Sequence, residues 1–158
     1  MKAELTFEGG TGIPLDKWDS RFLKLAHFIA EWSRDPSTKV GAVIVKDKRI
    51  VSSGFNGFPA GVNDLLERYE GREEKLLMTV HAEANAIVSA REPLLGCTIY
   101  VTRPPCASCA GKVIQAGIKK VICSPAPESF FERWKKDMNA SFTMFHEAGV
   151  ALIQGAVS

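Results

Sequence analysis

The spacing of apolar residues predicts a helix near the start of the chain. Between Asp16 and Ser33, large apolar side chains recur at steps of four, three, four and three residues, and they are Trp18, Phe22, Leu25, Ile29 and Trp32. This period places all of them on one face of a helix, so we expect the stripe to pack into a core. The helix should end before Pro36, because the residue that precedes a proline avoids helical geometry.

Apolar runs that alternate with helical patterns predict the rest of the fold. An apolar run over 40–45, a polar turn over 46–48 and a second run over 49–53 predict a β-hairpin. Helices are expected over 81–91, 107–116 and 130–148, and strands over 97–102, 119–124 and 150–154. The last helix should bury Phe131, Trp134, Met138, Phe142 and Phe145. This order indicates an α/β layered domain with a five-stranded mixed sheet, in which helical crossovers make the last three strands parallel.

Two short motifs place metal-binding side chains at the starts of two of these helices. His81 and Glu83 open one helix, while Cys106 and Cys109 open the next. Parallel strands bring both helix N-termini to the same sheet edge, so we expect the four side chains to meet. One imidazole and two thiolates leave the fourth tetrahedral position of a zinc ion open, which is typical of catalytic zinc. Glu83 would then move protons beside that position.

Other roles for the cysteines, in a redox pair or a structural zinc site, are alternatives to catalytic zinc. A lone Cys-x-x-Cys also occurs in redox pairs, and Cys97 or Cys123 could complete a structural zinc site. Both of those cysteines lie in apolar strand-like runs, where a cysteine is usually a small buried hydrophobe. A structural site would also give Glu83 no role, so the pattern favours a catalytic ion.

Composition and charge restrict the class of protein. With 158 residues and 46% apolar side chains, the chain suits a single globular domain, which we place at 16–158 after a flexible arm at 1–15. No apolar run approaches the roughly 20 residues that a membrane helix needs, and the N-terminus lacks the pattern of a signal peptide. Two cysteines outside the metal motif give no disulfide framework, so we expect a cytoplasmic protein. A net charge of +2 gives no basic patch on the scale of a polynucleotide partner.

These motifs resemble the cytidine deaminase superfamily, and most closely its deoxycytidylate (dCMP) deaminase branch. The pairing of His-x-Glu with Pro-Cys-x-x-Cys is typical of the zinc deaminases. A loop of the form Asn-Gly-x-Pro-x-Gly-x-x-Asp, over 56–64, points to the dCMP branch. Further similar segments are Ser33-Arg34-Asp35-Pro36, Val40-Gly41-Ala42, His81-Ala82-Glu83-Ala84-Asn85 and Gln115-Ala116-Gly117-Ile118. The resemblance implies a three-layer α/β/α cytidine-deaminase-like fold.

The resemblance also implies a reaction, the hydrolytic deamination of dCMP to dUMP and ammonia in pyrimidine deoxynucleotide metabolism. His81, Cys106 and Cys109 would hold one zinc ion per chain, and Glu83 would be the acid and base. Asn56 would hydrogen-bond the sugar hydroxyl, although Asn-Gly is also a common turn pair, and the backbone of Ala82 would contact the base. For the phosphate, the sequence does not choose among the cations Arg21, Arg34, Lys39 and Lys75.

The resemblance further bears on partners and on rival activities. It implies a homo-oligomer, normally a hexamer, and dCTP and dTTP as effectors. Regulated relatives carry tyrosine where this chain has Phe55, and relatives with a second zinc carry Cys and His in a segment that has neither here, 58–80. The rivals are another deaminase of the superfamily, acting on tRNA adenosine, a free base or a riboflavin precursor, and a non-catalytic module with structural zinc.

Overall fold

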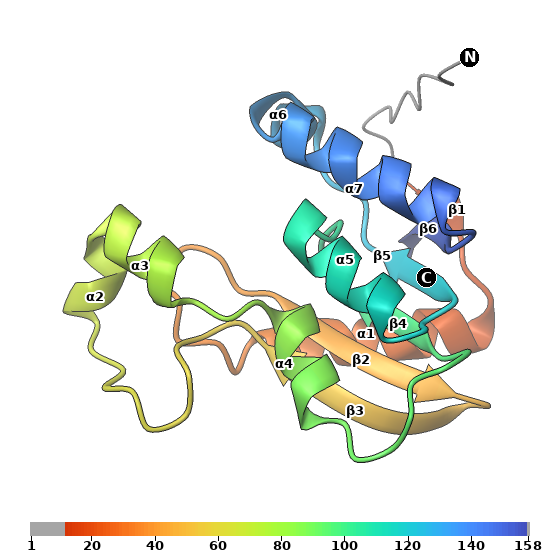
Figure 1. Ribbon diagram of the computed structural model, residues 1–158, viewed down its shortest axis with the longest axis horizontal. Coiled ribbons are helices and arrows are strands. Elements are labelled where there is room, and N and C mark those ends of the chain that lie inside the picture. Colours follow the sequence, from red (N-terminus) through yellow and green to blue (C-terminus); the bar gives the residue numbers. More distant parts are fainter. Residues whose placement is uncertain (1–11, 158) are drawn as a thin grey trace.

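A six-stranded mixed sheet forms the centre of the computed structural model, which describes residues 12–157 (Figure 1). The strand order is β1-β6-β5-β4-β2-β3. The strands are β1 (Ile13–Pro14), β2 (Gly41–Lys46), β3 (Arg49–Phe55), β4 (Thr98–Val101), β5 (Lys120–Cys123) and β6 (Ala151–Ala156). β2 is antiparallel to both β3 and β4. β4, β5 and β6 are parallel, which confirms the prediction for the last three strands.

The number of strands corrects one prediction, since the sequence indicated five. The additional strand is β1, which pairs in parallel with β6. It falls inside the segment expected to be a flexible arm, 1–15, and residues 1–11 of that arm lie outside the described part of the chain. A strand of two residues is too short to show a period of two, so the hydrophobic pattern did not predict it.

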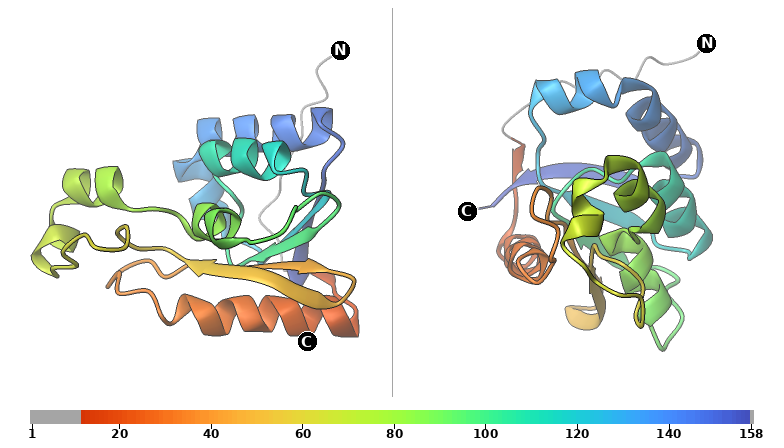
Figure 2. Two further views of the ribbon diagram at one scale, coloured as in Figure 1. Left: turned by 60° about the horizontal axis from the view of Figure 1, so that its bottom comes forward. Right: turned by 90° about the vertical axis from the view of Figure 1, so that its left-hand side faces the viewer.

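Helices cover both faces of the sheet and make three layers (Figure 2). α1 (Lys17–Ala30) lies on one face, and α4 (Ala82–Ser89), α5 (Ala107–Gln115) and α7 (Lys135–Glu147) lie on the other. Successive strand residues point to opposite faces. Val43 and Val45 therefore pack with α1, whereas Ala42 and Ile44 belong to the core under the other helices. This arrangement confirms the expected three-layer fold.

The buried face of α1 differs in part from the predicted stripe. Phe22 and Ile29 are buried as expected, but Trp18 is 38% exposed and Trp32 is 55% exposed. Leu23, Ala26 and Ala30 are the other apolar residues that face the sheet. Small side chains let the helix axis approach the strands closely, and this leaves the bulky tryptophans at the margins of the contact.

The last predicted helix is in fact two helices, α6 (Glu128–Arg133) and α7, which meet at Trp134. The backbone angles of Trp134, φ −111° and ψ 23°, are not helical, although no proline or glycine marks the break. Phe131 still packs against Phe142 across the junction, with ring centroids 6.2 Å apart. Trp134 itself is 37% exposed and does not join the core as predicted.

The segment between β3 and α4 projects from the body of the molecule (Figure 1). It contains two short helices, α2 (Glu67–Glu70) and α3 (Arg72–Met78). α3 has no buried residue. In the described part of the chain, no helix combines the length and the apolar character needed to cross a membrane.

Candidate active site

The N-terminus of α4 is held against β3 by close backbone contact. A Cβ atom at Gly54 would lie 2.5 Å from the carbonyl oxygen of Ala82 and 2.5 Å from the nitrogen of Ala86, so only glycine fits there. Ser52 donates a hydrogen bond from Oγ to the Ala86 carbonyl (2.6 Å), and Asn85 donates one from Nδ2 to the Phe55 carbonyl (2.8 Å). These contacts fix the first turn of α4.

The loop between β4 and α5, residues 102–106, ends at Cys106 and is called the cysteine loop here. It is held in place by α7. Ser141 donates a hydrogen bond from Oγ to the carbonyl oxygen of Pro105 (2.7 Å). Asp137 accepts a hydrogen bond at Oδ2 from the backbone N–H of Ala107, the first residue of α5 (3.1 Å). Both residues support the metal site without belonging to it. The sequence carries no signal for either, because each contact joins segments about 30 residues apart.

The three predicted metal ligands meet at the N-termini of α4 and α5. Nδ1 of His81 lies 3.5 Å from Sγ of Cys106 and 3.4 Å from Sγ of Cys109, and all three ligand atoms lie within 4.8 Å of one another. Zinc bonds of about 2.3 Å to sulfur and about 2.0 Å to nitrogen, at tetrahedral angles, would separate such atoms by about 3.6 Å. The observed spacing therefore fits one zinc ion with a fourth position left for a non-protein ligand.

The ionisation of these groups also suits a metal site. The hydrogen bond from the Cys109 thiol, together with one from His81, lowers the pKa of Cys106 to about 4. The same Cys106–Cys109 hydrogen bond and burial raise the pKa of Cys109, and the hydrogen bond to Cys106 raises the pKa of His81. The cluster thus already stabilises one thiolate. A divalent cation bound among them would displace the remaining protons.

Glu83 lies beside the ligands but is not one of them. Its side chain is nearly buried, at 4% exposure, and it interacts with the Cys109 thiol and the charge of His81. Burial raises the pKa of Glu83 above that of an ordinary glutamate, outweighing the opposing hydrogen bonds. A carboxyl group with a raised pKa next to a metal site can both accept and return a proton near neutral pH.

The two predicted substrate contacts occupy suitable positions. Asn56 is buried, and its Oδ1 accepts a hydrogen bond from the Val40 N–H while its Nδ2 donates one to the Thr38 carbonyl, both at 2.8 Å. Its amide retains one N–H and one lone pair for a ligand. Ala82, also buried, is the first residue of α4, where backbone N–H groups lack helical partners. Their substrate roles stay predictions.

The cations that the sequence suggested for a phosphate are largely occupied elsewhere. Lys75 forms an ion pair with the buried Asp35 (2.9 Å), and Arg34 lies 3.6 Å from Asp64. Arg21 belongs to α1, which packs on the other face of the sheet from α4 and α5, and its guanidinium lies over the Trp18 ring, 4.9 Å from the ring centre. Arg103 and Arg133, which we did not select from the sequence, line a cavity near the site. The position of Arg103 directly before the Pro-Pro-Cys motif was the only signal for either.

Comparisons with known proteins agree with this site. Residues 16–125 match a family model described as the cytidine and deoxycytidylate deaminase zinc-binding region. The chain is 52% identical to an uncharacterized deaminase from the luxG 3′ region of Aliivibrio fischeri, over 86% of this chain and 92% of that protein. It is 42% identical to mouse deoxycytidylate deaminase, over 67% of this chain and 64% of the mouse protein.

A solved structure resembles the whole domain. The dCMP deaminase of cyanophage S-TIM5, in its apo form, superposes with a TM-score of 0.68 at 25% identity and covers 87% of this chain and 97% of the phage chain. The likeness covers a larger share of the chain than the family model does. The fold, the metal ligands and the sequence similarity are therefore consistent with one another.

Proposed function

Because the chain belongs to the cytidine and deoxycytidylate deaminase family, we propose that it catalyses the zinc-dependent hydrolytic deamination of dCMP to dUMP and ammonia. The observation that carries the proposal is the joint placement of His81, Cys106 and Cys109 with the buried carboxyl group of Glu83. The substrate follows from similarity to the mouse deoxycytidylate deaminase. The reaction consumes one water and supplies dUMP to pyrimidine deoxynucleotide metabolism.

The chain's residues divide the chemistry between them. His81, Cys106 and Cys109 would hold the zinc ion, which would supply hydroxide at neutral pH because zinc lowers the pKa of bound water to about 7. Glu83 accepts the proton that this water loses and delivers it to N3 of cytosine while the oxygen adds to C4. Glu83 then passes the second proton of the water to the amino group, the C4–N4 bond breaks, and ammonia leaves. Asn56 and the Ala82 backbone orient the sugar and the base.

A substrate panel tests the reaction. The purified zinc-loaded protein is offered dCMP, deoxycytidine, cytosine, guanine, a riboflavin precursor and a tRNA anticodon stem, and ammonia release is measured. We expect dCMP to give the highest kcat/KM. Turnover of a free base, the riboflavin precursor or tRNA without turnover of dCMP would refute the substrate, and no turnover at all would favour a non-catalytic module.

Substitution of Glu83 tests the mechanism. Glu83→Gln keeps the shape of the side chain but cannot carry the proton, so turnover should fall by about 10²- to 10⁴-fold. Zinc, measured by elemental analysis, should stay near one ion per chain, because Glu83 is not a ligand. Glu147→Gln, at the far end of α7, is the matched control and should change neither quantity. Loss of zinc in Glu83→Gln would instead identify a fourth ligand.

We also propose a cytoplasmic homo-oligomer, with a hexamer as the expected assembly and dCTP and dTTP as the effectors to test. The four cysteines are free, which suits a reducing compartment. Leu76 and Leu77 of α3 and Val88 of α4 are exposed apolar side chains, and they would be covered in an assembly. Phe55, where regulated relatives carry tyrosine, contacts the exposed Trp32 ring edge-on.

A further inference from the structure

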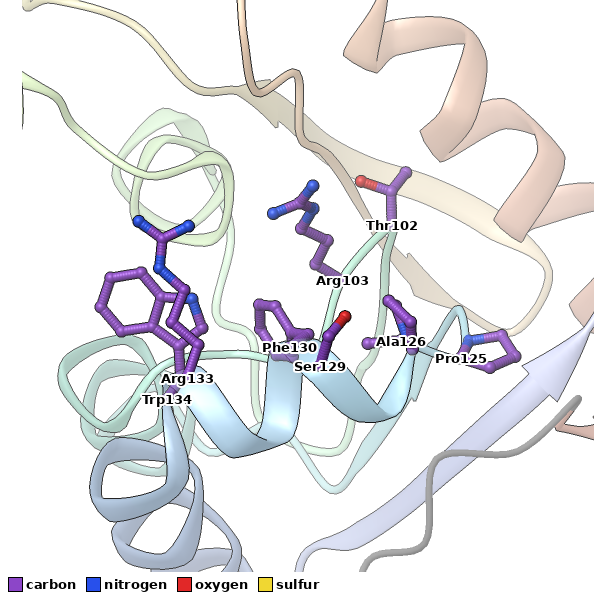
Figure 3. Close-up of a pocket in the computed structure, with 9 residues that line it drawn as sticks. Thr102, Arg103, Pro125, Ala126, Ser129, Phe130, Arg133 and Trp134 are labelled. Carbon is purple, nitrogen blue, oxygen red and sulfur yellow. The ribbon is translucent and has the colours of Figure 1, made fainter.

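A cavity of about 440 Å³ opens beside the metal site (Figure 3). Its walls come from two segments, the loop after β4 and the chain from the end of β5 into α6. Phe130 and Ala126 of this wall pack in the same apolar cluster as Cys106. The cavity is therefore next to the cysteine loop, and its volume is in the range of small-molecule sites.

Two arginines give the cavity a positive charge. The side chains of Arg103 and Arg133 extend to the same side of the cavity from the two wall segments (Figure 3). Among the residues that the structure describes, no Asp or Glu lines the cavity. Within residues 12–157 neither guanidinium has a hydrogen-bond or ion-pair partner. This distinguishes them from Arg34 and Lys75, whose charges are already paired.

Aromatic rings hold both guanidinium groups in place. The Arg103 guanidinium lies 5.8 Å from the centre of the Phe130 ring, and that of Arg133 lies 5.4 Å from the Trp134 ring. Such cation–π contacts restrict a long side chain without neutralising its charge. Trp134, at which α6 and α7 meet, also lines the cavity. Two oriented, unpaired arginines are suited to bind the oxygens of a phosphate in bidentate fashion.

The chain itself limits how far Arg103 can lie from the metal ligands. Arg103 is three residues before Cys106, so their Cα atoms are at most about 11 Å apart. The guanidinium of Arg103 can lie nearer to Cys106 than the Arg103 Cα atom does, or farther from it, depending on how the side chain enters the cavity. A cytosine with C4 at the metal would thus place its 5′-phosphate within reach of this wall.

We propose that Arg103 and Arg133 bind the 5′-phosphate of the substrate and make the enzyme select a nucleotide over a nucleoside. The inference rests on the proposed function and extends it to residues that it does not assign. Arg133 and α6 lie after residue 125, where the match to the family model ends. Of the two proposed phosphate ligands, Arg103 therefore lies within the shared zinc-binding region and Arg133 in the C-terminal segment.

The test compares dCMP with deoxycytidine in Arg103→Gln, Arg133→Gln and the double variant. Each single change should lower kcat/KM for dCMP about 10- to 100-fold, mainly through KM, because a charge-assisted hydrogen bond is lost. The kcat/KM for deoxycytidine should not change. Arg91→Gln, which removes the same charge beyond the opposite end of α4, is the control. The inference is wrong if the cavity variants behave like Arg91→Gln, or if both substrates lose equally.

A binding measurement separates this inference from the proposed function. The zinc-loaded protein is titrated by calorimetry with 2-deoxyribose 5-phosphate, which requires no deamination. Binding by the wild type and its loss in the double variant would support the phosphate site even if dCMP were not turned over. Equal binding by both proteins would overturn it. Selective loss of tRNA stem binding, with sugar phosphate unaffected, would assign the arginines to a polynucleotide and would also overturn it.

Discussion

Asp35 is a buried carboxylate that joins the loop after α1 to the projecting helix α3. It accepts hydrogen bonds from the backbone N–H groups of Ser37 (2.9 Å) and Thr38 (3.1 Å) and from Nζ of Lys75 (2.9 Å). Thr38 in turn accepts a hydrogen bond from the Asn56 side chain, so this network supports the predicted sugar contact. Burial alone would raise the pKa of Asp35, but these hydrogen bonds outweigh it and lower the pKa.

Asp35→Asn should therefore destabilise the protein in a pH-dependent way. Removing one partner of a buried ion pair costs about 3 kcal/mol, since the other charge stays uncompensated. A lowered folded-state pKa contributes stability above the ordinary aspartate pKa of about 3.9, and that stability is lost as the pH falls through the folded value. The difference in unfolding free energy between wild type and variant should be constant from about pH 7 to pH 5 and should shrink below about pH 4. Urea unfolding across this range measures it.

Glu74→Gln provides the control for Asp35. Glu74 forms an exposed ion pair with Arg68 at 3.7 Å, so its removal should change the unfolding free energy by less than about 1 kcal/mol. If Asp35→Asn were no more destabilising than Glu74→Gln at neutral pH, the buried network would not be holding the projecting segment that contains α3.

At the scale of elements, the position of α4 depends on the absence of a side chain at Gly54. Gly54→Ala should push the start of α4 away from β3, because the added Cβ meets backbone atoms that cannot rotate away. We expect a loss of about 1–3 kcal/mol in unfolding free energy, as for other overpacked sites. Zinc affinity should fall as well, since the displaced turn carries His81. Chemical unfolding and zinc competition with a chelator measure the two effects.

Gly111→Ala is the matched control, because it adds the same atom to the other helix of the site. A Cβ at Gly111 meets nothing within 4 Å. Alanine is preferred over glycine inside a helix by about 0.5–1 kcal/mol, so this variant should be more stable. Equal destabilisation by both changes would contradict the packing argument for Gly54.

Hydrophobic period predicted the elements better than their ends and breaks. The hairpin was predicted because two apolar runs flank a polar turn. In the structure, Asp47 and Lys48 of that turn both have positive φ, as two-residue type I′ hairpin turns require. The break at Trp134 was not, since α6 and α7 continue one helical pattern and no local residue interrupts it. A hydrophobic period does not record a single residue that leaves helical geometry.

The metal ligands were predictable for a different reason. The spacing within each motif fixes two side chains on one helical turn, and parallel strands bring the two turns together. The supporting contacts from Asp137 and Ser141, and the cavity arginines, depend on how α6 and α7 cross the cysteine loop. That crossing is set by the whole core, so neither contact could be predicted from neighbours in sequence.

At the scale of the whole molecule, α3 is a helix whose apolar side chains are not covered by the rest of the chain. Leu77 is 80% exposed, Leu76 is also exposed, and no residue of the helix is buried. The homo-oligomer that we propose would bury these leucines. A double substitution, Leu76→Lys and Leu77→Lys, should then reduce the mass measured by light scattering, while Glu73→Lys on the same helix should not. A wild-type protein of monomeric mass would contradict the proposed assembly.

The support that α7 gives to the cysteine loop has a consequence for how such enzymes diversify. Cutting the chain at residue 125 would retain every side chain that touches the metal, yet it would remove β6, α7 and the hydroxyl that satisfies the Pro105 carbonyl. The metal site and part of the proposed phosphate site are thus encoded in adjoining stretches that fold as one unit. The C-terminal stretch can change to accept a different substrate only through replacements that still hold the loop before Cys106 in place.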